Sequence, residues 1–345
     1  MPLRAADEAP EALRDTAAKA GLLYGSDSDS TIAKEPAAYG ELFARECALY
    51  ACYWSWALMH PKPGPAASAW DDPNIAFAKA HQIRLTGGHL LWNQNDPDWL
   101  KTVDAPGMEK AIHERIAEVG RLYAPLCYSW NVVNEAIAPE HKRVDGLRYT
   151  LYVEKLGPAF FDLAFRAAQA AAPGVLRVYN DFGMEMDDAD SEARRTFMLR
   201  LLDTLVAQGT PIQAVGLQSH LKIDGKVFNA PKFRSFLKEI AARGLKILIT
   251  ELDVLDMTTP PDTAMRDQAV ADFYTRYLDV VLDEPAVQAV TTWGLSDRYS
   301  WLNNPVFGLL RKDKLPARGL PFDGQLQPKP AFFALQDALR RAAKR

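Results

Sequence analysis

Two largely apolar runs that each lead directly into a glutamate constrain the fold of this chain more than any other feature. Residues 130–135 read WNVVNE, and residues 247–253 read ILITELD. A strand that is apolar along its length is buried on both faces, as in a parallel sheet covered by helices. A charged residue that closes such a run marks the carboxyl edge of the sheet, which is where α/β barrels keep their chemistry.

The rest of the chain alternates apolar, β-branched runs with amphipathic segments, which predicts the α/β class and a single-domain (β/α)8 TIM barrel. Strands are expected near residues 22–25, 48–54, 84–92, 127–134, 175–180, 214–218, 246–250 and 289–294. Helices are expected near residues 108–123, 160–172, 194–207, 232–242, 265–282 and 331–343.

The length of 345 residues fits one barrel with insertions. We expect residues 1–20 to form an N-terminal extension or a first helix that packs on the barrel, and residues 21–345 to form the barrel itself. Long loops rich in proline and glycine, at residues 61–65 and 303–324, are interpreted as insertions that line its mouth.

The composition excludes several classes of function. With 40 basic and 44 acidic residues the net charge is −4, so no basic stripe suits a nucleic acid backbone, and no apolar run is long enough to span a membrane. The three cysteines, Cys47, Cys52 and Cys127, lack the spacing of a structural metal site or a disulfide framework. The motifs of serine hydrolases, zinc proteases and nucleotide-binding proteins are also missing, and we expect no metal or other cofactor.

The two glutamates have polar companions that a simple solvated strand end would not need. Asn134 precedes Glu135 and carries an amide that can bond a sugar hydroxyl, while Asp253 follows Glu251 by two residues and can orient a basic partner. By our strand count the glutamates close the fourth and seventh strands, whose ends face one another across a barrel mouth. A pair of carboxyl groups placed in this way is typical of a glycosidase.

A third segment, residues 216–220, ends the sixth strand with Gln218 and His220. We expect His220 to bridge Asp253 and Glu251, and so to keep Glu251 ionised while the other carboxyl group holds its proton. The alternative, a histidine that is only structural, stays open for this position.

Aromatic residues gather near the same predicted edge, with Asn180 and Asp181 closing the fifth strand. Sugars present flat C–H faces to aromatic rings, so several rings at strand ends favour a saccharide cleft. The residues concerned are Trp92, Trp99, Tyr179, Trp293, Tyr299 and Trp301.

With these motifs in order, residues 20–340 resemble glycoside hydrolase family 10, the retaining endo-β-1,4-xylanases built on a (β/α)8 barrel. The motifs are residues 130–136, 179–181, 216–221, 249–253, 293–301 and 328–331. The resemblance implies that Glu135 is the acid/base and Glu251 the nucleophile, with Asp253 in support and no metal. It implies that a polysaccharide or oligosaccharide contacts Asn134, Trp92, His89, Tyr179, Gln218, His220, Trp293 and Trp301, with Trp301 on the glycone side.

The chain departs from the family at three strand ends. The family's second strand reads ENEMKW where residues 51–56 read ACYWSW, so the polar groups that grip the glycone-side xylose are absent. The family's RGHTLVWH becomes TGGHLLWN at residues 86–93, which displaces the histidine by one position. Because neighbouring strand residues point to opposite faces, the shift leaves open whether His89 replaces the family's imidazole. The family's YNDYN becomes YNDFG at residues 179–183.

The leading hypothesis is therefore retaining hydrolysis of β-1,4-linked xylan or xylo-oligosaccharides by double displacement. The altered strands motivate two alternatives. One is the same chemistry on another β-glycan, such as a bacterial exopolysaccharide or a decorated xylan, and the other is a non-catalytic carbohydrate-binding barrel. We expect a monomer, and a secreted or periplasmic location because polymeric substrates do not enter cells.

Overall fold

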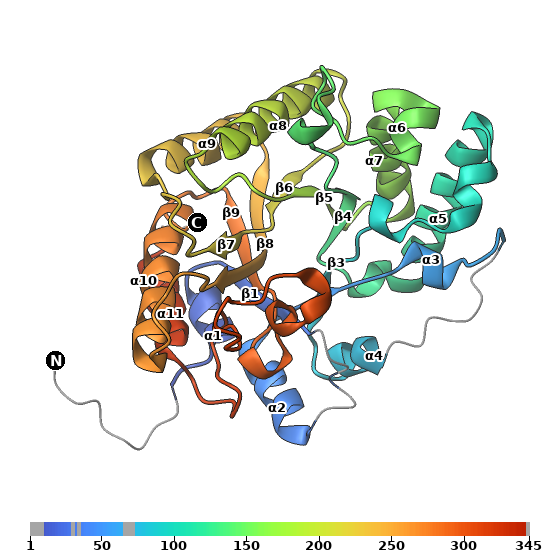
Figure 1. The fold of residues 1–345 in the computed structure, drawn as a ribbon. Helices are drawn as coiled ribbons and strands as arrows, with labels where there is room; N and C mark the ends of the chain where they lie inside the picture. Colours follow the sequence, from blue (N-terminus) through green and yellow to red (C-terminus); the bar gives the residue numbers. More distant parts are fainter. Residues whose placement is uncertain (1–9, 29–31, 33–35, 65–72, 343–345) are drawn as a thin grey trace.

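The predicted barrel is confirmed by the computed structural model, which describes residues 10–28, 32, 36–64 and 73–342. Parallel strands surround a central axis and helices cover them on the outside (Figure 1). The barrel strands are β1 (Leu23–Asp27), β2 (Leu49–Cys52), β3 (Arg84–Gly87), β4 (Ser129–Asn134), β5 (Leu176–Asp181), β6 (Ala214–Leu217), β8 (Lys246–Leu255) and β9 (Val287–Thr292). Each lies at or within a few residues of its predicted place.

The strands follow one another around the barrel in the order β3-β2-β1-β9-β8-β6-β5-β4. A parallel bridge between Leu85 and Cys127 joins β3 to the start of β4, and the N–H of Tyr128 donates to the carbonyl of Leu85 at 2.7 Å. The one strand that was not predicted is β7 (His220–Lys222), which pairs in parallel with the far end of β8.

Small and medium apolar side chains fill the barrel below its carboxyl end. Leu49, Val178, Ala214, Leu248 and Ala289 form a cluster separate from the larger core between strands and helices. Side chains alternate along a strand, so the residues two positions further along β5 and β8 also point inward, at the carboxyl edge. The inward-facing side chains change from apolar to polar at this level. The carboxyl edge is therefore a candidate functional site, whereas the layers below it form the core.

The helices on the outside are α1 (Leu13–Lys19), α2 (Ala37–Glu46), α3 (Trp56–Met59), α4 (Pro73–Ala80), α5 (Ala105–Tyr123), α6 (Leu151–Leu156), α7 (Phe160–Ala171), α8 (Ala189–Ala207), α9 (Ala230–Ala242), α10 (Thr263–Val281) and α11 (Pro330–Arg341). The predicted helices are confirmed, and α5, α8, α9 and α10 start two to five residues earlier than predicted, where N-cap side chains set their starts. The Asp104 carboxylate, for example, accepts from the N–H of Gly107 at 2.9 Å and begins α5.

The N-terminal helix α1 packs on the barrel's outer ring. The amide of Gln336 on α11 donates to the carbonyl of Glu11 at 2.6 Å, and the N–H of Leu13 donates to the Glu46 carboxylate on α2 at 2.8 Å. Within the described part of the chain, no helix is both long enough and apolar enough to cross a membrane.

Candidate active site

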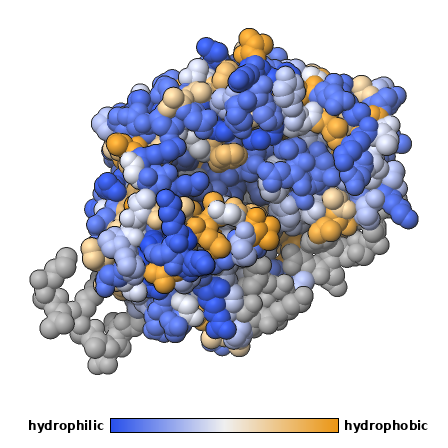
Figure 2. Space-filling model, viewed as in Figure 1, coloured by the Kyte–Doolittle hydropathy of each residue, from blue (hydrophilic) through white to orange (hydrophobic). Residues whose placement is uncertain are grey.

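A cavity of about 1390 Å³ opens at the carboxyl ends of the strands. Figure 2 shows a hollow in a mainly hydrophilic face, with apolar side chains gathered along one margin. Small-molecule pockets span roughly 300–1,000 Å³, so this cavity suits an extended ligand. It brings together most of the predicted site residues: His89, Trp92, Glu135, Gln218, His220, Glu251, Asp253, Trp293 and Trp301.

Glu251 lies on β8 between two imidazole groups. Its Oε2 is 3.2 Å from Nε2 of His220, and its Oε1 is 3.6 Å from Nε2 of His89. On the other side of its ring, His220 places Nδ1 3.0 Å from Oδ1 of Asp253. The predicted bridge of His220 between Asp253 and Glu251 is therefore confirmed.

These contacts decide the charges of the pair. Burial alone would raise the pKa of Glu251, but hydrogen bonds and positive charge from His220 and His89 outweigh it and lower the pKa to about 2. Burial would lower the pKa of His220, but the carboxylates of Asp253 and Glu251 raise it to about 10. Glu251 is thus a carboxylate and His220 an imidazolium across the neutral range.

Glu135 follows β4, and its backbone has the left-handed φ of 57°, which residues other than glycine rarely adopt. Its N–H donates to the carbonyl of Asn180 at 2.9 Å, and its own carbonyl accepts from Nε of Arg148 at 2.7 Å. These bonds hold the turn that directs its carboxyl group into the cavity, where Oε1 accepts from Nε2 of Gln218 at 3.0 Å.

A chain of amides connects the two carboxyl groups. Nδ2 of Asn180 donates both to Oε1 of Glu251 at 2.9 Å and to Oδ1 of Asn134 at 2.8 Å. Nδ2 of Asn134 in turn donates to Oε1 of Glu135 at 3.2 Å. Asn134 is 3% exposed and its amide positions Glu135, while its contact with a sugar stays a prediction.

The arrangement of two carboxyl groups at the mouth of a barrel agrees with the comparison with known proteins. The model of the family described as Glycosyl hydrolase family 10 matches residues 12–338. The chain belongs to glycoside hydrolase family 10.

Relatives of this family 10 protein are named as xylanases. It is 26% identical over 291 residues to Endo-1,4-beta-xylanase B of Thermotoga neapolitana, covering 84% of this chain and 79% of the relative. It is 30% identical over 342 residues to Endo-1,4-beta-xylanase 5 of Pyricularia oryzae, covering 96% and 80%. Among solved structures, xylanase 10B of Thermotoga petrophila RKU-1 in complex with xylobiose is 25% identical, with a TM-score of 0.84 over 97% of this chain and 98% of that one.

The structure answers the question that the sequence left open about the displaced histidine. The chain leaves the regular strand at Gly87 (φ 87°) and continues through Gly88 (φ 76°) and His89 (φ 31°), so the alternation of strand faces no longer applies. A Cβ on Gly88 would lie 2.4 Å from the Trp54 ring, which is why glycine is required there. This left-handed turn brings His89 back toward Glu251 in this family 10 barrel.

Three predicted tryptophans line the cavity. Trp92 and Trp293 contribute walls, and Trp301 packs against His220 with ring centroids 4.9 Å apart. Nε1 of Trp301 also donates to Oδ2 of Asp253 at 2.6 Å. Trp301 therefore fixes the same carboxylate that orients His220.

The predicted contact between Tyr179 and substrate is wrong. Val178 and Asn180 point into the barrel, so Tyr179 between them points outward toward the helices and is fully buried. Its hydroxyl donates to the carboxylate of Asp181, which faces the same way. Tyr179 is thus part of the core behind β5.

Two further aromatic residues of the predicted cluster also lie away from the cavity. Nε1 of Trp99 donates to the carbonyl of His60 at 2.9 Å, beneath the loop that follows α3. Tyr299 packs on Tyr39 of α2 with centroids 4.5 Å apart. Both rings attach loops to the scaffold.

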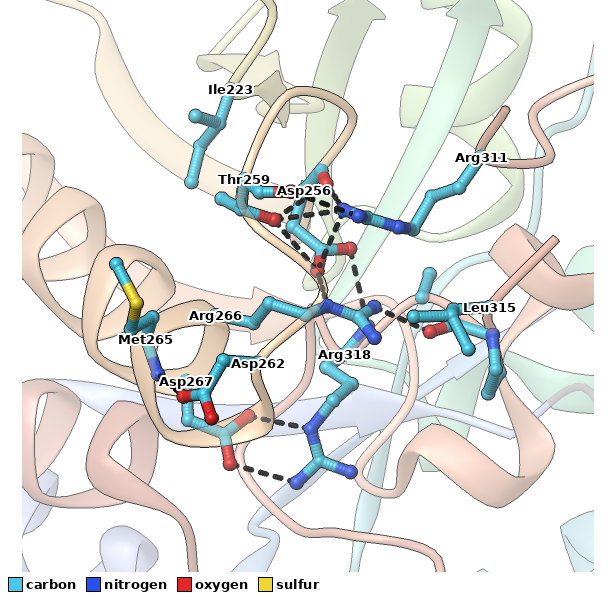
Figure 3. A network of polar contacts seen from close by, with 12 residues as sticks. Ile223, Asp256, Thr259, Asp262, Met265, Arg266, Asp267, Arg311, Leu315 and Arg318 are labelled. Atoms are coloured by element: carbon cyan, nitrogen blue, oxygen red, sulfur yellow. Dashed lines mark hydrogen bonds and ion pairs between the residues drawn. The ribbon is translucent and has the colours of Figure 1, made fainter. Parts of the chain in front are cut away.

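The loop of residues 303–324 lines the mouth as predicted, through Phe307 and Leu309. It is anchored by Arg311, which is 4% exposed and donates to the side chain and carbonyl of Thr259 at 2.8 and 2.9 Å. Figure 3 shows Asp256, at the end of β8, between Arg311 and Arg266, whose Nε donates to Asp256 at 2.6 Å. The other predicted lining loop is not confirmed, since residues 61–64 do not contact the cavity and residue 65 lies outside the described residues.

Several cavity residues were not found by inspection of the sequence. They lie on the segments that follow β2, β3 and β5, and on α8: Tyr53, Gln94, Phe182, Glu185 and Arg194. Phe182 and Glu185 directly follow the polar end of a strand, a signal that could have identified them. Tyr53 falls within the predicted strand 48–54 and Arg194 within the predicted helix 194–207, but neither was identified as a cavity residue, and Gln94 lies on a segment whose course the strand pattern does not determine.

Proposed function

We propose that this protein hydrolyses β-1,4-linked xylan or xylo-oligosaccharides by double displacement, with retention of anomeric configuration. The observation that carries the proposal is Glu251, a carboxylate held ionised by His220 and His89 and connected through two amides to Glu135 in the same cavity. The names of the relatives and the xylobiose bound to one of them support the choice of substrate.

In the first step, an oxygen of Glu251 attacks the anomeric carbon and the bond from that carbon to the leaving oxygen breaks. Glu135 transfers its proton to the leaving oxygen, and the glycone stays attached to Glu251 as an ester. In the second step Glu135 takes a proton from water, whose oxygen attacks the anomeric carbon and releases Glu251. Atoms balance with one water consumed for each bond cleaved.

The test is replacement of the nucleophile in the presence of an external one. Glu251→Gly should reduce hydrolysis of an aryl β-xylobioside to background, and azide should restore turnover with formation of a glycosyl azide. A matched control is Glu239→Gly at an exposed position of α9, which should keep wild-type activity. Full activity of Glu251→Gly without azide would remove Glu251 from the nucleophile role.

A second candidate substrate is another β-glycan or a decorated xylan, and Ala51, Cys52 and Tyr53 favour it because they lack the family's polar glycone contacts. Release of reducing ends across a panel of β-glycans separates the two candidates. Strong turnover of unsubstituted xylan alone would reject the second. Either polymer also supports a secreted or periplasmic site of action, which cell fractionation would check.

A further inference from the structure

Asp181, the last residue of β5, carries a buried carboxyl group to which the proposed chemistry gives no role. It is 0% exposed and faces outward behind the strand, so it does not touch a ligand in the cavity. A carboxyl group without access to water needs hydrogen bonds to offset its burial. Three donors supply them: the Tyr179 hydroxyl, the N–H of Ile137 to Oδ2 at 3.0 Å, and the N–H of Phe182 to Oδ1 at 2.9 Å.

The bond to Ile137 matters because Ile137 lies two residues beyond Glu135. The end of β5 therefore holds this part of the chain at two points: the carbonyl of Asn180 accepts from the N–H of Glu135 at 2.9 Å, and the carboxyl group of Asp181 accepts from the N–H of Ile137. The two bonds bracket the left-handed backbone of Glu135, at φ 57°. Such a backbone persists only where surrounding contacts hold it. Asp181 thus acts on the conformation of Glu135 from behind the strand.

The main chain of Asp181 makes a separate connection to the same carboxyl group. Its carbonyl accepts from the N–H of Gln218 at 3.0 Å, and Nε2 of Gln218 donates to Oε1 of Glu135 at 3.0 Å. On the far side of the turn, the carbonyl of Ile137 accepts from Nη1 of Arg194 at 3.1 Å. A substitution that alters only the side chain of Asp181 leaves both of these connections in place, so it isolates the bond to the N–H of Ile137.

The two carboxyl groups of the site depend on different supports. Glu251 is held on β8 by His220, His89 and the amide of Asn180, and none of these contacts passes through Ile137. A general acid must lie within hydrogen-bond reach of the atom that receives its proton. Misplacement of a reacting group by about 1 Å can cost roughly 10²-fold in rate. Loss of the bond from Ile137 should therefore impair proton transfer and leave the attack by Glu251 largely unaffected.

We propose that Asp181 is a positioning residue that holds the turn of Glu135 through the N–H of Ile137, and so sets the efficiency of proton transfer to the leaving oxygen. The inference rests on the proposed acid/base role of Glu135 and adds a residue that acts on it without touching substrate. It predicts a loss of activity that is confined to substrates whose leaving group needs a proton.

The experiment measures kcat/KM of Asp181→Asn on a series of aryl β-xylobiosides whose phenols range from strongly to weakly acidic. Asparagine has the size of aspartate but offers one acceptor oxygen where two N–H groups need one each. We expect kcat/KM within about twofold of the wild type on the most acidic phenol, and at least about tenfold lower on the least acidic phenol and on xylo-oligosaccharides. Azide, which needs no base in the second step, should raise kcat on the most acidic phenol more for the variant than for the wild type.

A second variant and a matched control separate positioning from folding. Asp181→Leu removes both acceptor oxygens and should give a larger loss of the same kind, and Asp181→Asn decides the question if the leucine variant does not fold. The control is Glu46→Gln, at a 0% exposed carboxylate of α2 that accepts from the N–H of Leu13 at 2.8 Å, away from the cavity. It should lower the melting temperature and keep the wild-type dependence on the phenol. Equal losses on all phenols in Asp181→Asn, or a dependence that coincides with the wild type, would overturn the inference.

The variant Glu135→Gln distinguishes failure of this inference from failure of the proposed function. Because it removes the acid itself, it should show the steepest dependence of kcat/KM on the acidity of the phenol. If Glu135→Gln shows that dependence and Asp181→Asn does not, the positioning role is rejected and the proposed function stands. If Glu135→Gln itself follows the wild type, the acid role of Glu135 is rejected, and the positioning role fails with it.

Hydrogen exchange tests the structural step independently of turnover, including the case in which no compound is cleaved and the proposed hydrolysis is rejected. The N–H of Glu135 is bonded to Asn180 and not to Asp181, so it reports whether the turn as a whole is held. Its exchange should be at least about tenfold faster in Asp181→Asn than in the wild type, because the turn opens more often. In Glu46→Gln it should keep the wild-type rate. Unchanged exchange in Asp181→Asn would overturn the inference.

Discussion

Replacing His220 by glutamine tests how Glu251, the proposed nucleophile, is kept ionised. The pKa of Glu251 falls from its ordinary value of 4.5 to about 2, and at about 1.4 kcal/mol per unit this drop corresponds to about 3 kcal/mol of preference for the carboxylate. His220, with Nε2 at 3.2 Å, contributes more than His89 at 3.6 Å. A glutamine amide can still donate one hydrogen bond but carries no charge.

We therefore expect the pKa of Glu251 in His220→Gln to rise by about 1–2 units. The assay is kcat/KM against pH from 2 to 6 on an aryl β-xylobioside, because this ratio reports ionisation of the free enzyme. The acid limb of the profile should move upward by the same amount, while circular dichroism checks that the variant is folded over the range used.

The matched control is His113→Gln, at an exposed position of α5 away from the cavity. Its profile should coincide with that of the wild type. Acid limbs of wild type and His220→Gln that superimpose would show that the imidazolium does not hold Glu251 ionised, and the electrostatic reasoning would be refuted.

Three further perturbations follow from the same contacts. Glu135→Gln should lower kcat/KM on xylo-oligosaccharides by roughly 10²–10⁴-fold but spare aryl glycosides with good leaving groups, which need no proton; equal losses on both substrates would contradict its acid role. Asp256→Ala removes the carboxylate that pairs with the buried Arg266, while Arg311 keeps its ion pair with Asp313, and should cost about 3–5 kcal/mol in urea unfolding, against less than about 1 kcal/mol for Asp313→Ala at a partly exposed ion pair. The lowered pKa of Glu251 contributes stability that is complete above pH 4.5 and lost toward pH 2, whereas the raised pKa of His220 contributes stability that is complete below pH 6.5 and lost toward pH 10. Melting temperature should therefore fall on both sides of pH 4.5–6.5, and Glu251→Gln should flatten the acid side.

The barrel could be predicted from the sequence because it repeats one strand-and-helix unit. All eight barrel strands were predicted from apolar runs, since a strand covered by helices must be apolar on both faces. The bridge of His220 between Glu251 and Asp253 was also predictable, because Asp253 lies two residues along the same strand and His220 at the end of a neighbouring one. In regular strands, the spacing of residues in the sequence determines which side chains lie close together.

Errors arose where one face of a strand was taken for another. Tyr179 looks like a cleft residue because it is aromatic and lies near a strand end, but Val178 fixes the inward parity of β5 and directs Tyr179 outward. Tyr53 was passed over although it falls within the predicted strand 48–54; β2 ends at Cys52, and the segment beyond it brings Tyr53 to the cavity. Aromatic type alone did not distinguish core from cavity.

The proposed catalytic groups and their partners lie at points where strand regularity is broken. Three non-glycine residues at the carboxyl edge have left-handed backbones: His89 at φ 31°, Glu135 at φ 57° and Ser219 at φ 64°. Each such residue costs about 1–3 kcal/mol and persists only where other contacts hold it. The reversal at Ser219 separates β6 from β7 and lets His220 pair directly opposite Asp253. The backbone is thus strained at the residues that direct two imidazole groups and one carboxyl group into the same cavity. A periodic sequence pattern carries no information about these turns.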